Sequence, residues 1–561
     1  MEQFKQEVIK ELEKVTKLEK NQLLSLLEIP DPKFGDFAFP TFVLAKSLKK
    51  NPNQIAQEFA NKLKPTKIIT KIQATGPYVN FFINPTATST TILAQITKSK
   101  SKYGQGKKTN KTVLIEGWQP NTHKAFHIGH IRNAVLSESL ARILEYQGNK
   151  VIRCAYMGDV GTHVAKWLWY FTKFHKGDIP NKNVTKWAGE IYTKATQLSQ
   201  ENPDYQKEIH ELHSKLENGD KTLIKLWKKT RQLCLKDIMA ILKELDSHVG
   251  RVYYESEVEQ PGKKIVKELA AKGVAQYSDG AIILNLEHYN LGVFVLLKSN
   301  GASLYSTKDI ALAYLKSKEF EFTTSLYVVG AEQDHHFRQL FKTLELIGYP
   351  DAAKVKHVSF GLVVLKEGKM SSRQGNIVLY EDFREQLFQQ VAKQIASLAL
   401  PEKEKAVIKK TVAFGAMKFT MLSQDAHKEI VFDPEQALSF EGETGPYIQY
   451  THARISSILR KSEQPKKPNY SLLQEELEQR IVAQLALFPQ KVQESAQHLK
   501  PNLIARYLID LAQLFNEFYH KYPVLKAEIE LRKARLVLCQ ATATVLKNGL
   551  ALLSIEAPER M

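Results

Sequence analysis

The order of segments between residues 112 and 156 constrains the fold of this chain more than any other feature. A short β-branched run at Thr112 to Glu116 predicts a buried strand, and a loop containing Asn121 follows it. Apolar residues at near-helical spacing then indicate a helix that ends at Gly148, before a second apolar segment from Val151 to Tyr156. This order predicts a doubly wound α/β fold, whose ligands bind beyond the carboxyl ends of the strands.

Two histidines lie at the predicted crevice. His127 and His130 stand on either side of Gly129, at the expected start of the helix. Imidazole donors and a helix N-terminus stabilise negative charge on phosphate oxygens, and glycine lets the backbone approach a ligand closely. These residues therefore indicate phosphoryl or nucleotidyl chemistry. The alternative is a surface turn with two solvated histidines, and the strand and helix around the motif argue against it.

A second polar segment lies far downstream, where Leu365 to Asn376 reads LKEGKMSSRQGN. An HIGH motif followed much later by such a loop resembles the signature pair of class I aminoacyl-tRNA synthetases, in which both motifs flank ATP. Within that class the chain is similar to arginyl-tRNA synthetases from near Phe34 to its last residue. Six separated sequences carry this resemblance: PNTHKAFHIGHIRN, MGDVGTH, LYSTKDIALA, YVVGAEQDHHF, GPYIQYTHAR and the terminal ERM.

The resemblance implies both an architecture and a reaction. It implies a Rossmann-type catalytic domain, an N-terminal α+β domain that contacts the elbow of tRNA, and an all-helical C-terminal domain that binds the anticodon. It implies an arginine–tRNA ligase that activates L-arginine with ATP and transfers the arginyl group to the 3′ end of arginine tRNA, releasing AMP and pyrophosphate. Mg²⁺ is expected to accompany ATP, bound mainly by the phosphates.

Helical and strand periodicity along the chain predict the domain boundaries. We expect the N-terminal domain at 1–100, the catalytic domain at 108–380 with a helical insertion at about 166–246, a helical connecting region at 381–440, and the anticodon-binding domain at 441–561. A basic, Gly-containing segment at Ser99 to Lys111 is expected to link the first two domains. A further strand is expected from Val358 to Val364.

The charge balance favours a polyanionic partner. Lys and Arg number 79 against 60 Asp and Glu, which gives a formal net charge of +19. A basic surface that serves only solubility is the alternative. The three cysteines are far apart and form no CxxC pair, so we expect neither a disulfide framework nor zinc or another bound metal. The first residues show no targeting pattern and no apolar run reaches membrane-spanning length, so we expect a cytoplasmic protein. As a separate expectation, we take it to be a monomer.

By the same resemblance, His127 and His130 bind the phosphates of ATP, and Gly129 gives room for adenosine. In the downstream loop, ATP contacts are expected from Lys369, Met370 and Ser371. The loop departs from the family pattern in one respect, because Ser372 stands where a second lysine is usual, with Arg373 after it. We expect Lys124 to supply this missing cation, with Arg373 as the competing candidate.

Selecting arginine requires carboxylates that receive the guanidinium group. Asp309 and Glu255 match the acids of the family that bind the side chain, and Tyr305 is expected to wall the pocket. On residue chemistry alone, Asp309 could instead be an acid at a helix N-terminus and Glu255 a surface charge. The predicted arginine site comprises Glu116, Asn121, Glu255, Tyr305, Asp309 and Gln333. A metal site at His335 and His336 is disfavoured, because adjacent side chains point in different directions and no further ligands join them.

Near the C-terminus, Tyr447, Tyr450 and Arg454 recur every three or four residues, so they share one face of a helix. Such a face is suited to stacking on unpaired anticodon bases, with Met561 nearby at the chain end. A tyrosine stripe packed on a neighbouring helix is the alternative. Two rival functions also stay open: a catalytically silent RNA-binding paralogue, which Ser372 permits, and a nucleotidyltransferase that acts without tRNA.

Overall fold

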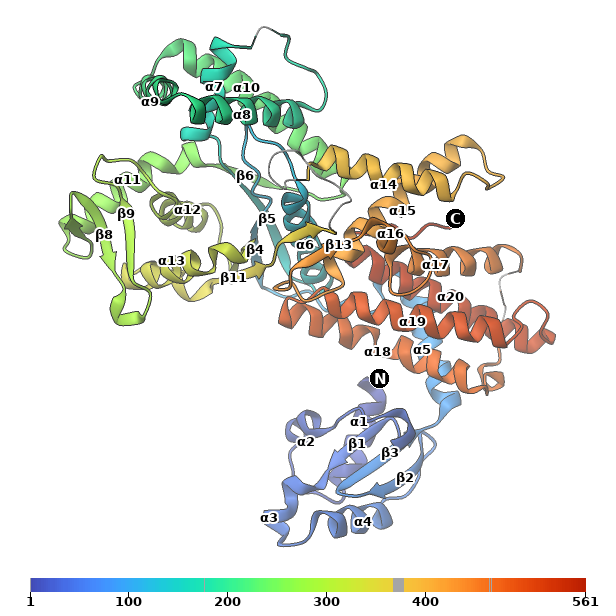
Figure 1. Cartoon of the computed structure of the whole chain (residues 1–561). Helices are drawn as coiled ribbons and strands as arrows, with labels where there is room; N and C mark the ends of the chain where they lie inside the picture. The colour runs from blue at the N-terminus through green and yellow to red at the C-terminus, as the bar shows by residue number, and fades with distance from the viewer. Residues whose placement is uncertain (1, 176, 367–377, 464, 466) are drawn as a thin grey trace. The chain divides into compact units, whose positions relative to one another are not determined.

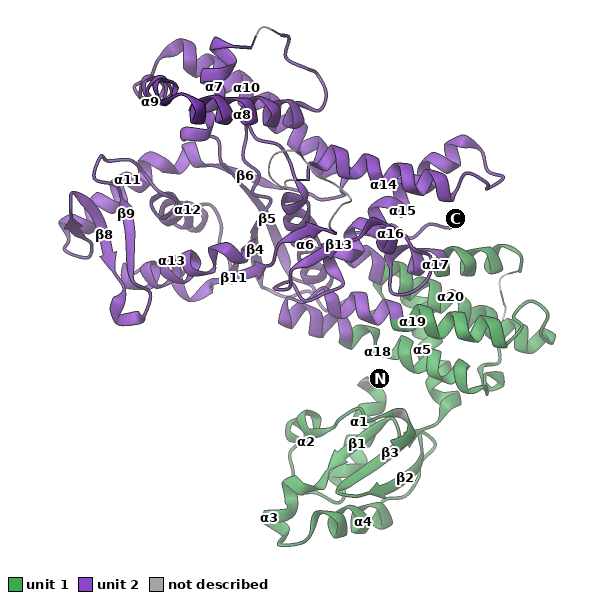
Figure 2. Ribbon diagram, in the orientation of Figure 1, with its two compact units in different colours: residues 1–104, 451–490, 510–548 green, residues 105–450, 491–509, 549–561 purple. Residues whose placement is uncertain are grey.

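A computed structural model of the chain describes residues 2–175, 177–366, 378–463, 465 and 467–561 (Figure 1). These residues form two compact units, each of which combines distant parts of the sequence (Figure 2). Unit 1 comprises residues 1–104, 451–490 and 510–548, and unit 2 comprises residues 105–450, 491–509 and 549–561. No helix among the described residues combines the length and hydropathy that crossing a bilayer requires.

The first part of unit 1 is an α+β fold around an antiparallel sheet with strand order β1-β3-β2. Phe37, Phe39 and Phe81 are buried in it, which explains why this aromatic-rich segment forms strands. The helical pattern that begins the chain is divided into two helices. The elements are α1 (Glu2–Glu13), α2 (Lys20–Leu26), β1 (Phe37–Pro40), α3 (Ala45–Leu48), α4 (Pro52–Lys62), β2 (Ile69–Thr75), β3 (Tyr78–Ile83) and α5 (Pro85–Ser99).

The remainder of unit 1 comes from the C-terminal helices α17 (Gly445–Arg460), α18 (Glu476–His498), α19 (Asn502–Lys521) and α20 (Ile529–Leu552). The segment after α5, predicted as a linker, packs against this helical part. The hydroxyl of Tyr103 donates to the Leu485 carbonyl at 3.1 Å. Gly104 has φ +90, and a Cβ there would lie 2.9 Å from the Phe488 ring. Glycine is therefore required where the chain leaves unit 1.

Unit 2 is built on a parallel five-stranded sheet with strand order β11-β10-β4-β5-β6. Because the chain moves outward from β4 in both directions, the sheet is doubly wound and its topological switch point lies between β4 and β10. This confirms the predicted fold class. The strands are β4 (Thr112–Gly117), β5 (Lys150–Met157), β6 (Arg251–Tyr254), β10 (Thr324–Gly330) and β11 (Val355–Phe360).

Helices and two smaller sheets surround this parallel sheet. An antiparallel sheet has the order β7-β8-β9, and β12 pairs with β13 in parallel. The helices of the catalytic region are α6 (Ile128–Tyr146), α11 (Glu255–Ala271), α12 (Tyr305–Glu319), α13 (Asp334–Leu346), α14 (Tyr380–Gln394), α15 (Glu402–Leu422) and α16 (Pro434–Ala437). The additional strands are β7 (Gln276–Ser278), β8 (Ala281–Asn285), β9 (Val293–Leu297), β12 (Val363–Leu365) and β13 (Ile430–Phe432).

Four helices fill the chain between β5 and β6, where the helical insertion was expected. They are α7 (Thr162–Lys173), α8 (Val184–Glu201), α9 (Pro203–Glu217) and α10 (Lys221–Glu244). Their apolar faces share a core that contains Trp167, Ile191 and Cys234. All three cysteines of the chain are buried and unpaired, so Cys234 and the others act as small core residues.

The segment expected as one strand from Val358 to Val364 is two strands with a break at Gly361 and Leu362. The chain changes its partner strand at this break, because β11 pairs with β10 whereas β12 pairs with β13. Arg132 on α6, which is 1% exposed, holds the backbone there. Its guanidinium donates to the carbonyls of Gly361 and Leu362, and to those of Ala426 and Lys428.

The last residues of the chain return to unit 2 and are held by a buried lysine. The Lys418 ammonium on α15 donates to the carbonyl and hydroxyl of Ser554. Burial lowers the pKa of Lys418 to about 7, against the attraction of Asp246. The unfolded chain therefore binds this proton more tightly than the folded chain does.

This pKa predicts that stability rises with pH. Between pH 7 and about pH 10.5 the unfolded state carries more protons at Lys418 than the folded state, so deprotonation favours folding. We expect wild type to gain about 5 kcal/mol over this range relative to Lys418→Met. Urea denaturation of both proteins at a series of pH values measures the difference. Parallel stability curves for the two proteins would show that Lys418 titrates normally.

Candidate active site

The two histidines of the HIGH motif cap the N-terminus of α6, directly after β4. Their rings stack with centroids 3.8 Å apart and planes at 26°. The Gly129 amide donates to Nδ1 of His127 at 3.2 Å, and the His127 amide donates to Nδ1 of His130 at 3.3 Å. Because each Nδ1 accepts a backbone N–H, the proton of each neutral ring is on Nε2. Both rings are thus arranged to donate a hydrogen bond from Nε2.

Both imidazoles are neutral at physiological pH. Burial, together with the charge of Lys124, lowers the pKa of His127 to about 4. Burial also lowers the pKa of His130 well below its ordinary value, and His127 and Lys124 add to this effect. The histidines therefore contribute directed N–H dipoles at this site, while lysines contribute the positive charge.

The low pKa of His127 predicts an activity profile without a transition near pH 6.5. As pH falls, kcat/KM for ATP should stay level until the ring protonates near pH 4. His127→Asn keeps a hydrogen-bond donor that does not titrate. The pH profile of this variant should therefore lack the fall in kcat/KM that protonation of His127 causes near pH 4. An inflection near pH 6.5 that is present in wild type and absent from His127→Asn would contradict the prediction.

The polar segment from Leu365 to Asn376, which we call the KMSKS-like loop, is tied to this same motif by the residues on either side of it. After the loop, the Ile128 amide donates to the Val378 carbonyl, and the Tyr380 amide donates to the Phe126 carbonyl. Before it, Arg132 holds the backbone that leads into β12. The predicted ATP-binding residues Lys369, Met370 and Ser371, with Ser372 and Arg373, lie outside the described residues.

Lys124 lies on the loop between β4 and α6, half-buried beside the histidines. Its ammonium is 5.1 Å from the ring centre of Tyr192 on α8. Burial lowers the pKa of Lys124, the carboxylate of Glu255 opposes this shift, and Lys166 reinforces it. The structure thus places a cation within the electrostatic range of both histidines and of the acids at the start of α11.

Asp309 lies in the first turns of α12 and is held by a histidine. The Asp309 carboxylate is 2.7 Å from Nε2 of His336 on α13. His336 also packs edge-on against Phe294, with ring centroids 5.5 Å apart. One oxygen of Asp309 is thereby oriented. Sequence reasoning only disfavoured a metal site at His336 and missed this contact, because the partner is 27 residues away.

The other two predicted acids are already neutralised by lysines of α12. Glu255 is 6% exposed and its carboxylate lies 2.8 Å from the Lys308 ammonium. Glu116 is 2% exposed and pairs with Lys316, while Gln119 donates to its other oxygen. Burial raises the pKa of both acids, and in each case the neighbouring lysine opposes the shift. Their arginine-binding role stays a prediction.

The remaining predicted residues of the arginine site lie on three other segments of unit 2. Asn121 and Gly158 form an isolated parallel β-bridge. A Cβ on Gly158 would lie 2.1 Å from Asn121 Oδ1 and 3.7 Å from the Glu255 carboxyl carbon. Glycine is required here because the two polar side chains approach its backbone. Tyr305 begins α12 and is 68% exposed. Gln333 is exposed in the turn that follows β10.

Three further residues at this edge were missed by sequence reasoning. The hydroxyl of Tyr156, near the end of β5, is buried and has no hydrogen-bond partner among the described residues. Asp159 accepts from the amide and hydroxyl of Ser256 and pairs with Arg231 at 2.6 Å. These contacts fix the start of α11 beside β5. Arg231 on α10 gave no local signal, because its partner is 72 residues away.

The C-terminal aromatic face lies on α17. Tyr447 is half-buried, and Tyr450 is 37% exposed with its ring 6.0 Å from that of Phe440. Arg454 donates to Asn516 Oδ1 at 2.7 Å, and its guanidinium lies 5.2 Å from the ring centre of Tyr519. Met561 is half-buried at the chain end. Arg454 therefore connects α17 to α19, and its contact with RNA stays a prediction.

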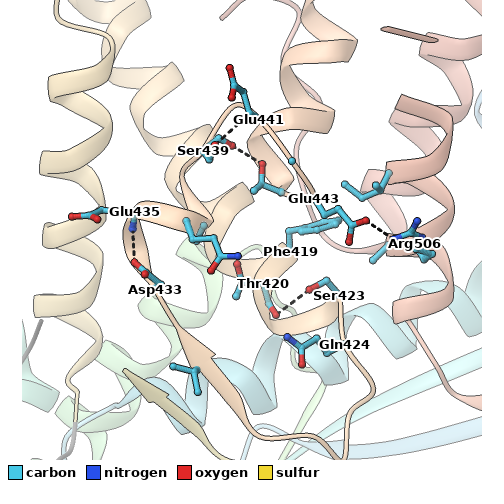
Figure 3. A pocket seen from close by; sticks show the side chains of 17 residues that line it. Phe419, Thr420, Ser423, Gln424, Asp433, Glu435, Ser439, Glu441, Glu443 and Arg506 are labelled. Atoms are coloured by element: carbon cyan, nitrogen blue, oxygen red, sulfur yellow. Dashed lines mark hydrogen bonds and ion pairs between the residues drawn. The ribbon is translucent and has the colours of Figure 1, made fainter. Parts of the chain in front are cut away.

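A separate cavity of about 570 Å³ lies between α15, α16 and α19, and none of the predicted site residues lines it (Figure 3). Two of its carboxylates form contacts within the protein. Glu443 pairs with Arg506 at 2.5 Å. Asp433 caps α16 through the Glu435 amide and pairs with Lys366 at 2.8 Å. We assign no ligand to the cavity.

Three family models together match most of the chain. Residues 92–434 match the model described as tRNA synthetases class I (R), catalytic domain. Residues 2–83 match the arginyl tRNA synthetase N terminal domain, and residues 448–561 match the DALR anticodon binding domain. A curated arginine–tRNA ligase of Clostridioides difficile (strain 630) is 38% identical over 559 residues, covering 98% of each chain. That of Clostridium perfringens is 36% identical, covering 100% of each.

Solved structures agree with these relatives. The arginyl-tRNA synthetase of Thermus thermophilus is similar with a TM-score of 0.81 and 29% identity, covering 95% of each chain. The arginyl-tRNA synthetase of Plasmodium falciparum has the same fold, with a TM-score of 0.76 at 21% identity over 95% of this chain and 94% of that one. The histidines at the start of α6 and the acids of α11 and α12 thus stand in a matched catalytic domain, and the chain belongs to the arginyl-tRNA synthetase family.

Proposed function

We propose that this chain carries out the reaction of its family at the switch point between β4 and β10. In the first step, a carboxylate oxygen of L-arginine attacks the α-phosphorus of ATP and pyrophosphate leaves. In the second, a ribose hydroxyl at the 3′ end of arginine tRNA takes the arginyl group from AMP. The observation that carries this proposal is the pair of neutral histidines on one side of the edge and the buried acids on the other.

The phosphate side belongs to the loop before α6 and to the start of that helix. Nε2–H of His127 and of His130 donates to phosphate oxygens, and Gly129 leaves space for adenosine. Lys124 supplies the positive charge that the neutral rings lack. Lys369 of the KMSKS-like loop neutralises the departing pyrophosphate, together with Met370 and Ser371 as ATP contacts.

The guanidinium side belongs to α12. Asp309 binds the guanidinium through the oxygen that His336 leaves available. Glu255, paired with Lys308, offers its carboxylate as a second hydrogen-bond acceptor near Asn121. Tyr305 covers the pocket, while Asn121 and Gln333 bind the α-amino and carboxylate groups. Glu116 with Lys316 forms the buried floor, so its effect on arginine is electrostatic.

Mg²⁺ fits this site as a companion of ATP. Within the residues that the structure describes, no group of three or more His, Cys, Asp or Glu side chains is placed to hold a metal ion. Phosphate oxygens would therefore be its main ligands, and it would neutralise their charge. We further propose that the protein acts as a cytoplasmic monomer and that the α17 face, with Met561, contacts the anticodon.

Charging of tRNA with labelled arginine tests the proposal. The purified chain, ATP and total tRNA should convert labelled arginine into acid-precipitable arginyl-tRNA, and omission of ATP should abolish the signal. Labelled lysine is the matched control, because it carries a cation without the planar guanidinium fork. Salt-sensitive tRNA binding without charging would instead favour a silent RNA-binding paralogue.

A further inference from the structure

The outer face of α10 carries a stripe of lysines. Six exposed lysines lie on this helix: Lys221, Lys225, Lys228, Lys229, Lys236 and Lys243. At 3.6 residues per turn, all six project within about 100° of the helix circumference and span about 33 Å. We call this surface the α10 lysine stripe. It is a concentrated source of positive potential in a chain whose formal net charge is +19.

The charge of the stripe is not neutralised locally. None of the six lysines forms an ion pair with another described residue. The two acids of α10 are used elsewhere, since Asp237 accepts from Thr185, and Glu244 accepts from Tyr380 and Arg384. A lysine face that only aided solubility would usually alternate with acids, as Lys207 does with Asp204 on α9. The stripe is therefore suited to an external polyanion.

The inner face of the same helix packs against the segment that follows β5, at the carboxyl ends of the sheet strands. Cys234, Ile238 and Leu242 are buried there, opposite the lysines. Trp227 donates from Nε1 to the Asp159 carbonyl at 2.7 Å, and Arg231 pairs with the Asp159 carboxylate. Lys228 and Lys229 thus lie within two residues of Trp227, which contacts the segment that follows β5. A polyanion on the stripe would be held beside the end of the sheet where the reaction takes place.

Phosphate groups of RNA fit the stripe better than a membrane surface does. An interfacial helix needs large apolar side chains to bury in lipid, and the exposed arc of α10 offers only Met239, which is 36% exposed. Lysine binds phosphate as a point charge without base preference, which suits contact with a backbone.

We propose that the α10 lysine stripe docks the phosphate backbone of tRNA near its acceptor end. This inference rests on the proposed function, because the 3′ end of the tRNA must reach the edge that α10 supports. Each lysine that neutralises a phosphate releases counterions, so the stripe should make tRNA binding strongly dependent on salt. It should not contribute to binding of arginine or ATP.

Two triple variants with equal changes in net charge test the proposal. The first is Lys225→Ala, Lys228→Ala and Lys236→Ala on the stripe. The control is Lys264→Ala, Lys267→Ala and Lys272→Ala along α11, where exposed lysines alternate with acids such as Glu268. The stripe variant should raise KM for tRNA about tenfold, whereas KM for arginine and for ATP should stay within about twofold. The control should behave as wild type.

The salt dependence and a rescue variant separate docking from general effects. In the stripe variant, the slope of log Kd for tRNA against log salt should fall by about 2, because up to three phosphate contacts are lost. Replacing the same three lysines with arginine should restore both KM and the slope. An RNA hairpin that copies only the acceptor stem should show the same defect.

Three results would overturn the proposal. Equal KM values for the stripe variant and wild type would exclude a docking role, and equal defects in both triple variants would reduce it to net charge. Loss of binding to vesicles of anionic lipid, with an unchanged KM for tRNA, would assign the stripe to a membrane. Failure of wild type to charge tRNA at all would instead count against the proposed function, so the two failures are distinguishable.

Discussion

Replacing Asp309 with asparagine is expected to lower kcat/KM for arginine by about a thousandfold. Asparagine keeps the shape of the side chain and its contact with His336, which lies 2.7 Å away, but it removes the charge that receives the guanidinium. A buried site built for a cation loses about 4 kcal/mol when the charge that pairs with it is removed. This fall in kcat/KM should come mainly from a higher KM for arginine, measured in the charging reaction. The KM for ATP should change little.

Glu255→Gln provides the comparison for this variant. Because Glu255 already pairs with Lys308 at 2.8 Å, its loss leaves a buried ammonium without a partner. We therefore expect Glu255→Gln to lower the melting temperature as well as the affinity for arginine, whereas Asp309→Asn should melt like wild type. An Asp309→Asn protein that binds arginine normally would remove Asp309 from the pocket.

Replacing Lys124 with alanine is expected to cut arginine activation by several orders of magnitude with little loss of folding. Both histidines are neutral, so the loop before α6 has no other fixed cation to meet the charge that develops on the phosphates. Lys124 is half-buried against Tyr192 and makes no backbone contact that the fold needs. Pyrophosphate exchange measures the activation step, and circular dichroism measures folding.

Arg373→Ala is the matched test of the competing candidate. If Lys124 supplies the missing cation, Arg373→Ala should retain most of the exchange activity. Lys124→Arg should recover part of it, because the charge is kept while its position changes. Near-wild-type exchange by Lys124→Ala, together with strong loss in Arg373→Ala, would transfer the role to Arg373.

Much of the catalytic framework could be predicted from short stretches of sequence. The strand Thr112–Gly117, the loop after it and the histidine-capped helix α6 follow from local periodicity and turn chemistry. The doubly wound order then fixes the edge of the sheet where ligands bind. His127, Asn121 and Gln333 follow β4 or β10, the two strands at the switch point, as their positions in the sequence require.

The electrostatic partners at this edge could not be predicted in the same way. Lys308 and Lys316 have the spacing of an ordinary exposed helix face, yet each neutralises a buried acid on another element. Arg132 is part of a helical motif, but its guanidinium acts 229 residues away, at Gly361. Such pairings depend on which elements the sheet brings together. The spacing of residues along one helix does not predict these neighbours.

The divided strand near Gly361 shows the same limit. Apolar residues continue from Val358 to Val364, while the structure changes partner strand at Gly361 and Leu362, where the guanidinium of Arg132 binds the backbone. Tertiary contacts here override a local pattern.

Exchange of labelled pyrophosphate into ATP, measured with each amino acid separately in the presence of total tRNA, tests the central claim most directly. The proposed site, with Asp309 on α12 and the neutral histidines at the start of α6, predicts exchange with arginine and with no other amino acid. Exchange driven by a different amino acid, or no exchange despite tRNA binding, would contradict the assignment of this edge as an arginine-activating site.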